Sequence, residues 1–154
     1  MKNLVVLLSV LMFCLGGIAR DLGTSWVETN EGRIDCEKVI LGYNNARIVL
    51  DNGQRSTITL SKVKSFSIDG KVFIKLPLYK EGKPTSQMVF MELIKDNGEL
   101  SLYKYTSFNL GSPDPKEKID QFFLYNGNKL HLVLDEKTLP NICKHFGVTY
   151  SYSR

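Results

Sequence analysis

The stretch MVFMELIKDNGELSLYKY, residues 88–105, decides the fold class of this chain. Its centre, Asp96-Asn97-Gly98, separates two segments that are rich in aliphatic and aromatic residues. Asn or Asp beside Gly tolerates a positive φ angle and favours a tight hairpin turn. The stretch therefore predicts two antiparallel strands, residues 88–94 and 100–106, joined by that turn.

The same pattern recurs along the chain and predicts a fold made mostly of hairpins. Residues 51–53, 69–70 and 126–127 also place Asn or Asp beside Gly, between segments rich in Val, Ile, Phe, Tyr and Thr. Short strands at this spacing predict a mainly β, antiparallel fold, either a sandwich or a small barrel. The other expected strands are residues 25–29, 33–41, 47–50, 55–60, 64–68, 71–76, 119–125 and 129–134.

Two polar stretches that contain proline interrupt this pattern, and both are expected to be loops. Residues 77–86 hold two prolines and one glycine. Two interpretations stay open there: a loop inside one domain, or a boundary between two small sheets. Residues 107–118 form the longer of the two stretches. The remaining length, residues 20–154, suits a single β-rich domain.

One helix is predicted, at residues 138–147, which read TLPNICKHFG. Thr138 is a suitable residue for the start of a helix, and Gly147 is a suitable residue for its end. The apolar residues between them recur at the spacing of one helix face. That face consists of Leu139, Ile142, Cys143 and Phe146.

Residues 1–19 have the pattern of a secretory signal peptide. A basic residue precedes an apolar run at residues 4–15, and Gly17 and Ala19 provide the small residues of a cleavage site after Ala19. The run is short for a transmembrane span. Lipidation at Cys14 is disfavoured because a phenylalanine precedes it. We therefore expect a secreted or periplasmic protein without a transmembrane segment after cleavage.

Cleavage leaves two cysteines, Cys36 and Cys143, as candidates for one disulfide. Cys36 is expected to share a strand face with Ile34 and Ile40, and Cys143 lies on the apolar face of the predicted helix. Closing a loop of about 100 residues contributes about 4–5 kcal/mol in the chain-entropy model. The alternative is two buried free thiols that never meet, since cysteine is often buried in any case.

The sequence offers little support for catalysis or for a metal or other cofactor. Cys143 and His145 are two positions apart on a helix, so they point about 200° apart and cannot act as a nucleophile and its base. His131 and His145 do not have the spacing of zinc ligands. An enzymatic alternative is a small secreted hydrolase with dispersed acidic residues, namely Glu92, Glu99 and Asp120.

The charge and the aromatic residues indicate the kind of partner. The formal net charge is only +4, and no long run of Lys and Arg occurs, so nucleic-acid binding is not expected. Tyr103 and Tyr105 share a predicted strand face, and Phe108 follows in the predicted loop. Together they predict an exposed aromatic surface that suits a protein partner or a sugar ring. The alternative is that the core covers one face of this sheet and the helix covers the other.

Three stretches carry a resemblance: residues 63–76 (VKSFSIDGKVFIKL), the hairpin of residues 88–105, and residues 121–134 (QFFLYNGNKLHLVL) before the helix. With the pattern G-x-L-S-L-Y at residues 98–103, they are similar to short secreted β-rich proteins of unknown function from Bacteroidota. The resemblance spans roughly residues 63–147. It implies a compartment and a β-rich architecture, but no activity and no site.

We therefore expect a non-enzymatic binding or interaction module, secreted or associated with the cell envelope, whose partner is an unknown protein or glycan. Two alternatives remain. One is the small secreted hydrolase, and the other is a structural accessory subunit of an envelope assembly that buries its aromatic face.

Overall fold

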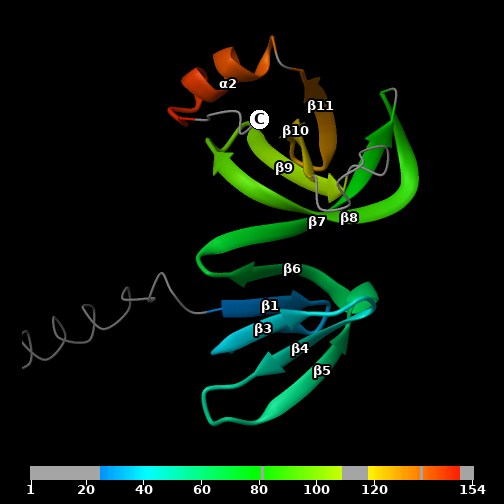
Figure 1. Cartoon of the computed structure of the whole chain (residues 1–154), viewed down its shortest axis with the longest axis vertical. Coiled ribbons are helices and arrows are strands. Elements are labelled where there is room, and N and C mark those ends of the chain that lie inside the picture. Colours follow the sequence, from blue (N-terminus) through cyan, green and yellow to red (C-terminus); the bar gives the residue numbers. More distant parts are fainter. Residues whose placement is uncertain (1–24, 81, 109–117, 136, 150–154) are drawn as a thin grey trace, which may run out of the picture.

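The computed structural model describes residues 25–80, 82–108, 118–135 and 137–149. The predicted signal peptide, Cys14 and most of the predicted loop at residues 107–118 lie outside the described residues. The described chain consists mainly of antiparallel β-strands, with one 3₁₀ turn and one short C-terminal helix (Figure 1). This architecture confirms the predicted fold class.

The larger of two sheets has eight strands in the order β11-β10-β9-β8-β7-β6-β1-β2, and every described pairing in it is antiparallel. Its end strands, β11 and β2, do not pair with each other, so the described strands do not close into a barrel. The eight strands are β1 (Ser25–Thr29), β2 (Gly32–Cys36), β6 (Val63–Ile68), β7 (Lys71–Lys80), β8 (Lys83–Asp96), β9 (Ser101–Phe108), β10 (Lys118–Asn126) and β11 (Lys129–Leu134).

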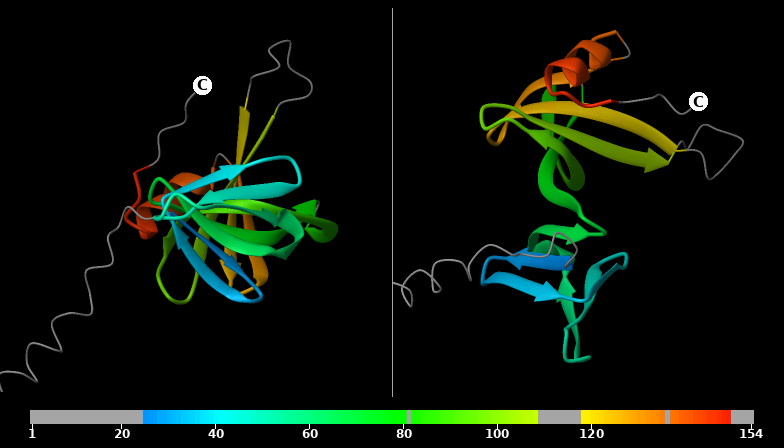
Figure 2. Two further views of the ribbon diagram at one scale, coloured as in Figure 1. Left: turned by 90° about the horizontal axis from the view of Figure 1, so that it is seen from below. Right: turned by 90° about the vertical axis from the view of Figure 1, so that its left-hand side faces the viewer.

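The smaller sheet has three strands in the order β3-β4-β5, namely β3 (Lys38–Leu41), β4 (Asn45–Val49) and β5 (Arg55–Thr59). It packs on β1, β2 and β6, where Val27 and Phe66 of the large sheet share a buried cluster with Val39 and Ile48 of the small sheet. The 3₁₀ turn η1 (Leu60–Lys62) leads from β5 back to the large sheet. The result is a two-layer sandwich at one end of an elongated molecule (Figures 1 and 2).

The predicted strand at residues 33–41 is in fact two strands in different sheets. β2 belongs to the large sheet and β3 to the small sheet, with Glu37 between them. The break shifts the alternation of faces, so Val39 is buried while Ile40 is 39% exposed, contrary to the prediction that Ile40 would join Cys36 in the core. Each half follows the sheet in which it finds hydrogen-bond partners, and the local pattern does not encode that choice.

The prediction of a loop at residues 77–86 is wrong, because β7 and β8 continue through this stretch. Tyr79 pairs with Pro84 and Lys80 with Lys83, close to the end of the hairpin. Pro77 lies at an irregularity in the ladder, where a missing N–H is tolerated. Irregularities of this kind bend a strand, and Figure 1 shows that β7 and β8 are strongly curved.

The curved hairpin and the helix cover opposite faces of β9 and β10. On one face, Met91, Tyr103 and Tyr125 belong to a buried cluster with residues of β7. On the other face, the helix α2 (Leu139–His145) packs its predicted apolar side against the sheet (Figure 1). The residues buried in this second cluster are Leu102, Phe122, Leu124, Leu134, Leu139, Cys143 and Phe146.

The helix begins after Thr138 and ends before Gly147 as predicted, but the Thr138 side chain does not cap it. Asp135 organises the start: its carboxylate accepts hydrogen bonds from the backbone N–H groups of Thr138 at 2.8 Å and Lys137 at 3.0 Å. These bonds, with another from the Thr138 hydroxyl, hold the pKa of Asp135 below its ordinary value. At the other end, Gly147 has a φ of +64° and Val148 N–H bonds to the Cys143 carbonyl at 2.9 Å, which forms a Schellman motif.

Candidate protein-binding surface

The structure divides the aromatic surface predicted from Tyr103, Tyr105 and Phe108. Tyr103 is only 6% exposed, Tyr105 is half-buried, and Phe108 is 62% exposed at the end of β9 rather than in a loop. Successive residues of a strand point to opposite faces, so Phe108 lies on the face opposite to the two tyrosines. The three residues therefore do not form one exposed surface.

Tyr103 is buried because the curved β7–β8 hairpin covers its face. Its ring meets that of Tyr125 edge to face, with centroids 5.5 Å apart. The Tyr125 hydroxyl donates a hydrogen bond to the Pro77 carbonyl at 2.9 Å. Burial raises the pKa of Tyr125 to about 12 and also raises the pKa of Tyr103. Both faces of β9 are covered at this point, as the alternative interpretation of the sequence proposed.

Exposed apolar side chains do exist, but they lie towards the edge of the sheet and on both of its faces. Ile119 is 42% exposed, Leu132 is 40% exposed and Val133 is 43% exposed. The pairings of β10 with its neighbours place Ile119, Val133 and the half-buried Tyr105 on one face, with Leu132 on the other. We call Leu132 and Val133, one on each face, together with the outer side of β11, the β11 edge surface.

The position of β11 explains why this surface is open to a partner. β11 is the last strand of the sheet and pairs only with β10 among the described strands, so its outer backbone groups have no neighbouring strand. The sequence does indicate apolar residues on both faces of this strand, because residues 129–134 read KLHLVL. That indication is ambiguous by itself, because a central strand buried on both faces has the same pattern.

Two acidic residues of the hydrolase alternative, Glu92 and Asp120, are held by other groups, and Glu99 is exposed between β8 and β9. Glu92 forms ion pairs with Lys104 at 3.0 Å and with Lys71 at 3.4 Å. Asp120 accepts a hydrogen bond from the Thr106 hydroxyl at 2.6 Å. Strand β9 lies between the strands that carry Glu92 and Asp120. This arrangement differs from the two carboxyl groups that flank a glycosidic bond in glycosidases.

The two cysteines are free thiols in the structure, so the predicted disulfide is not formed. Both side chains are buried, as predicted, but Cys36 belongs to the sandwich cluster and Cys143 to the cluster under α2. Burial raises the pKa of each thiol. Cys143 is buried, whereas His145, two positions later, is exposed.

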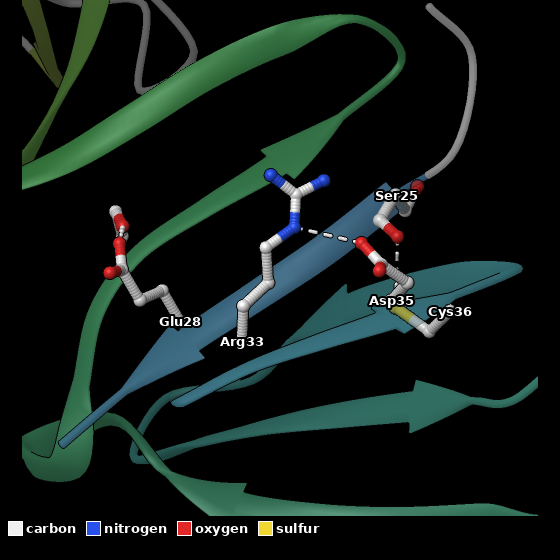
Figure 3. A network of polar contacts seen from close by, with 6 residues as sticks. Ser25, Glu28, Arg33, Asp35 and Cys36 are labelled. Carbon is white, nitrogen blue, oxygen red and sulfur yellow. Dashed lines mark hydrogen bonds and ion pairs between the residues drawn. The ribbon is translucent and has the colours of Figure 1, made fainter. Parts of the chain in front are cut away.

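A polar network lies on β1, β2 and β6, which are neighbouring strands of the large sheet (Figure 3). The Arg33 guanidinium bonds to Asp35 at 2.8 Å and lies over the ring of Trp26, 4.4 Å from its centroid. The Ser65 hydroxyl donates a short hydrogen bond to Glu28. The Arg33–Trp26 and Ser65–Glu28 contacts join neighbouring strands across one face, whereas the Arg33–Asp35 pair lies within β2. The side chains therefore bond to one another rather than point to a common centre.

Within residues 25–80, 82–108, 118–135 and 137–149, no group of three or more His, Cys, Asp or Glu side chains is placed to hold a metal ion. In the same residues, no helix has the length and apolar character needed to cross a membrane.

Comparison with known proteins gives one informative similarity. No protein-family model and no solved structure matches the chain. Among curated proteins, the chain is similar to the dolichyl-diphosphooligosaccharide–protein glycosyltransferase subunit SWP1 of Saccharomyces cerevisiae, with 32% identity over 111 residues. The matched region is 68% of this chain but only 37% of the yeast protein, so the chain spans about 37% of its relative's length.

Proposed function

We propose that this chain is a non-enzymatic accessory subunit of a larger protein assembly. The similarity to a protein named as a subunit of a glycosyltransferase carries the proposal. Of the functions expected from the sequence, it favours the structural accessory subunit over a freely acting binding module. The arrangement of Glu92 and Asp120, each held by other side chains, supports a role without catalysis.

In this proposal the β11 edge surface is the site of assembly. A partner strand pairs with the outer side of β11, and its main-chain hydrogen bonds supply much of the affinity. Leu132 and Val133 then lie on opposite faces of the extended sheet, where side chains of the partner cover them. Half-buried Tyr105 continues the face of Val133 and Ile119.

The test is a comparison of two charged variants of the tagged chain. Val133→Lys places a cation on the β11 edge surface, and Met88→Lys is the matched control, because Met88 is a similarly exposed apolar residue on β8. We expect the wild type and Met88→Lys to elute from native extract in one stoichiometric complex, and Val133→Lys to elute as a monomer. Cross-links from the complex should map to Lys129 and its neighbours.

Two results would reject this assembly site. One is a Val133→Lys variant that stays in the complex, and the other is a wild-type chain that elutes as a monomer from every extract. An equal loss of the complex with Met88→Lys would mean that any added charge disrupts assembly. Circular dichroism of both variants separates loss of binding from loss of folding.

We also propose that the protein acts outside the cytoplasm, in a secreted or envelope compartment, as the signal-peptide pattern of residues 1–19 and the resemblance to secreted Bacteroidota proteins imply. The mature protein should then begin at Arg20. Mass spectrometry of the protein from its native source checks this, and an intact N-terminus would contradict it.

A further inference from the structure

The outer face of the small sheet gathers three cations. Lys38 and Arg55 both pair with Val49, so the side chains of Lys38, Val49 and Arg55 lie on one face. Arg47 precedes Val49 by two residues and shares that face. The inner face is buried in the sandwich cluster, so the cations stand on the side that faces solvent.

No ion pair within the described residues neutralises these cations. Lys38, Arg47 and Arg55 are all exposed, and the ion pairs within the described residues all lie on the large sheet. The nearest carboxylates in sequence, Glu37 and Asp51, form no ion pair with them in the described structure. The face therefore carries a local positive charge that the modest net charge of the chain conceals.

Apolar groups accompany the cations. A depression of about 390 Å³ on this face is lined by the three cations together with Ile40 and Val49. On the same face Ile40 is 39% exposed, and Tyr43 in the turn after β3 is 95% exposed. Exposed aromatic and aliphatic side chains beside cations are suited to the boundary between lipid headgroups and acyl chains.

We propose that this basic sheet face, defined by Lys38, Arg47 and Arg55 with Tyr43 at its margin, binds a membrane surface that contains acidic lipids. The cations contact the lipid phosphates and carboxylates, and Tyr43 inserts among the headgroups. A small soluble anion would explain the cations but not the exposed Ile40 and Tyr43. The face lies at the opposite end of the molecule from β11 and α2 (Figure 2), so this inference does not rest on the proposed assembly site.

The experiment is flotation of the purified chain, residues 20–154, with two kinds of vesicle. One contains phosphatidylcholine alone, and the other also contains phosphatidylserine. We expect binding to the acidic vesicles only, with release at high salt because salt screens exposed charges. The double variant Arg47→Gln/Arg55→Gln should bind about thirtyfold more weakly, since each basic residue near an acidic surface contributes about 1 kcal/mol.

A matched control removes the same charge elsewhere. Lys95 and Lys144 are exposed on the other half of the molecule, so Lys95→Gln/Lys144→Gln should bind acidic vesicles almost as well as the wild type. Tyr43→Ser should weaken binding without changing its salt dependence. Melting curves of each variant confirm that these exposed substitutions leave the fold intact.

Several outcomes would overturn the proposal. They are a wild type that does not bind acidic vesicles, equal binding to both kinds of vesicle, and an equal loss of binding in the control double variant. Binding to soluble polyglutamate without binding to vesicles would instead identify an acidic protein segment as the partner.

Discussion

Replacing Tyr125 with phenylalanine tests how the curved hairpin is held over the sheet. The Tyr125 hydroxyl on β10 donates to the Pro77 carbonyl on β7 at 2.9 Å, which joins residues 48 positions apart. The ring packs edge to face against Tyr79 and Tyr103, at centroid distances of 6.2 and 5.5 Å. Phenylalanine keeps the ring and its packing, so the substitution removes only the hydroxyl.

At neutral pH the expected loss of stability in Tyr125→Phe comes from that one hydrogen bond. A net hydrogen bond contributes about 1 kcal/mol, and a buried partner left unsatisfied costs about 1–3 kcal/mol. The Pro77 carbonyl lies in a partly buried position, so we expect Tyr125→Phe to lower the free energy of unfolding by about 1–2 kcal/mol.

At alkaline pH the advantage of the wild type should disappear. Burial raises the pKa of Tyr125 to about 12, while an unfolded tyrosine titrates near about 10. A raised folded-state pKa stabilises the fold fully below the unfolded pKa, and this stabilisation is lost as the pH rises through the folded pKa. Two pKa units correspond to about 2.7 kcal/mol, lost between about pH 10 and pH 12. Tyr125→Phe should lack this loss.

Urea unfolding followed by the fluorescence of Trp26, the only tryptophan in the sequence, measures both effects from neutral pH to about pH 11. Tyr43→Phe is the control, because Tyr43 is 95% exposed and its hydroxyl makes no described hydrogen bond. The reasoning would be refuted if Tyr125→Phe matched the wild type at neutral pH and lost stability just as steeply in alkali.

Three further predictions concern the core, the helix end and the cysteines. Met91→Ala should cost about 2–5 kcal/mol in urea unfolding because Met91 is 0% exposed, whereas Met88→Ala at a 49% exposed position should change stability by less than about 0.5 kcal/mol. Gly147→Ala should lower stability by about 1–2 kcal/mol, because φ is +64° although no atom lies within 4 Å of the added Cβ; an unchanged melting temperature would count against it. Thiol titration of the denatured, unreduced protein should find both Cys36 and Cys143 free, and no titratable thiol would restore the disulfide.

The candidate site shows where sequence patterns lose their predictive power. Alternation along β9 correctly placed Tyr103 and Tyr105 on one face, opposite Leu102, but it did not indicate that a curved hairpin covers Tyr103. The curvature arises at ladder irregularities near Pro77 and Leu93, which depend on pairing between strands. The exposure of a side chain depends on what packs on its face of the sheet, so the residue pattern of one strand could not predict it.

The sequence by itself determined the local structure of this protein. Asn or Asp beside Gly set the hairpin turns, and apolar spacing with Gly147 set the helix and its end, because turn and helix-end conformations depend on neighbouring residues. The tertiary structure decided which strands share a sheet, so that Cys36 and Val39 entered different sheets despite lying three residues apart. It also decided that β11 is an edge, because no other described strand pairs with its outer side, and that Lys38, Arg47 and Arg55 stay on an open face, because the sandwich buries the opposite face of the small sheet.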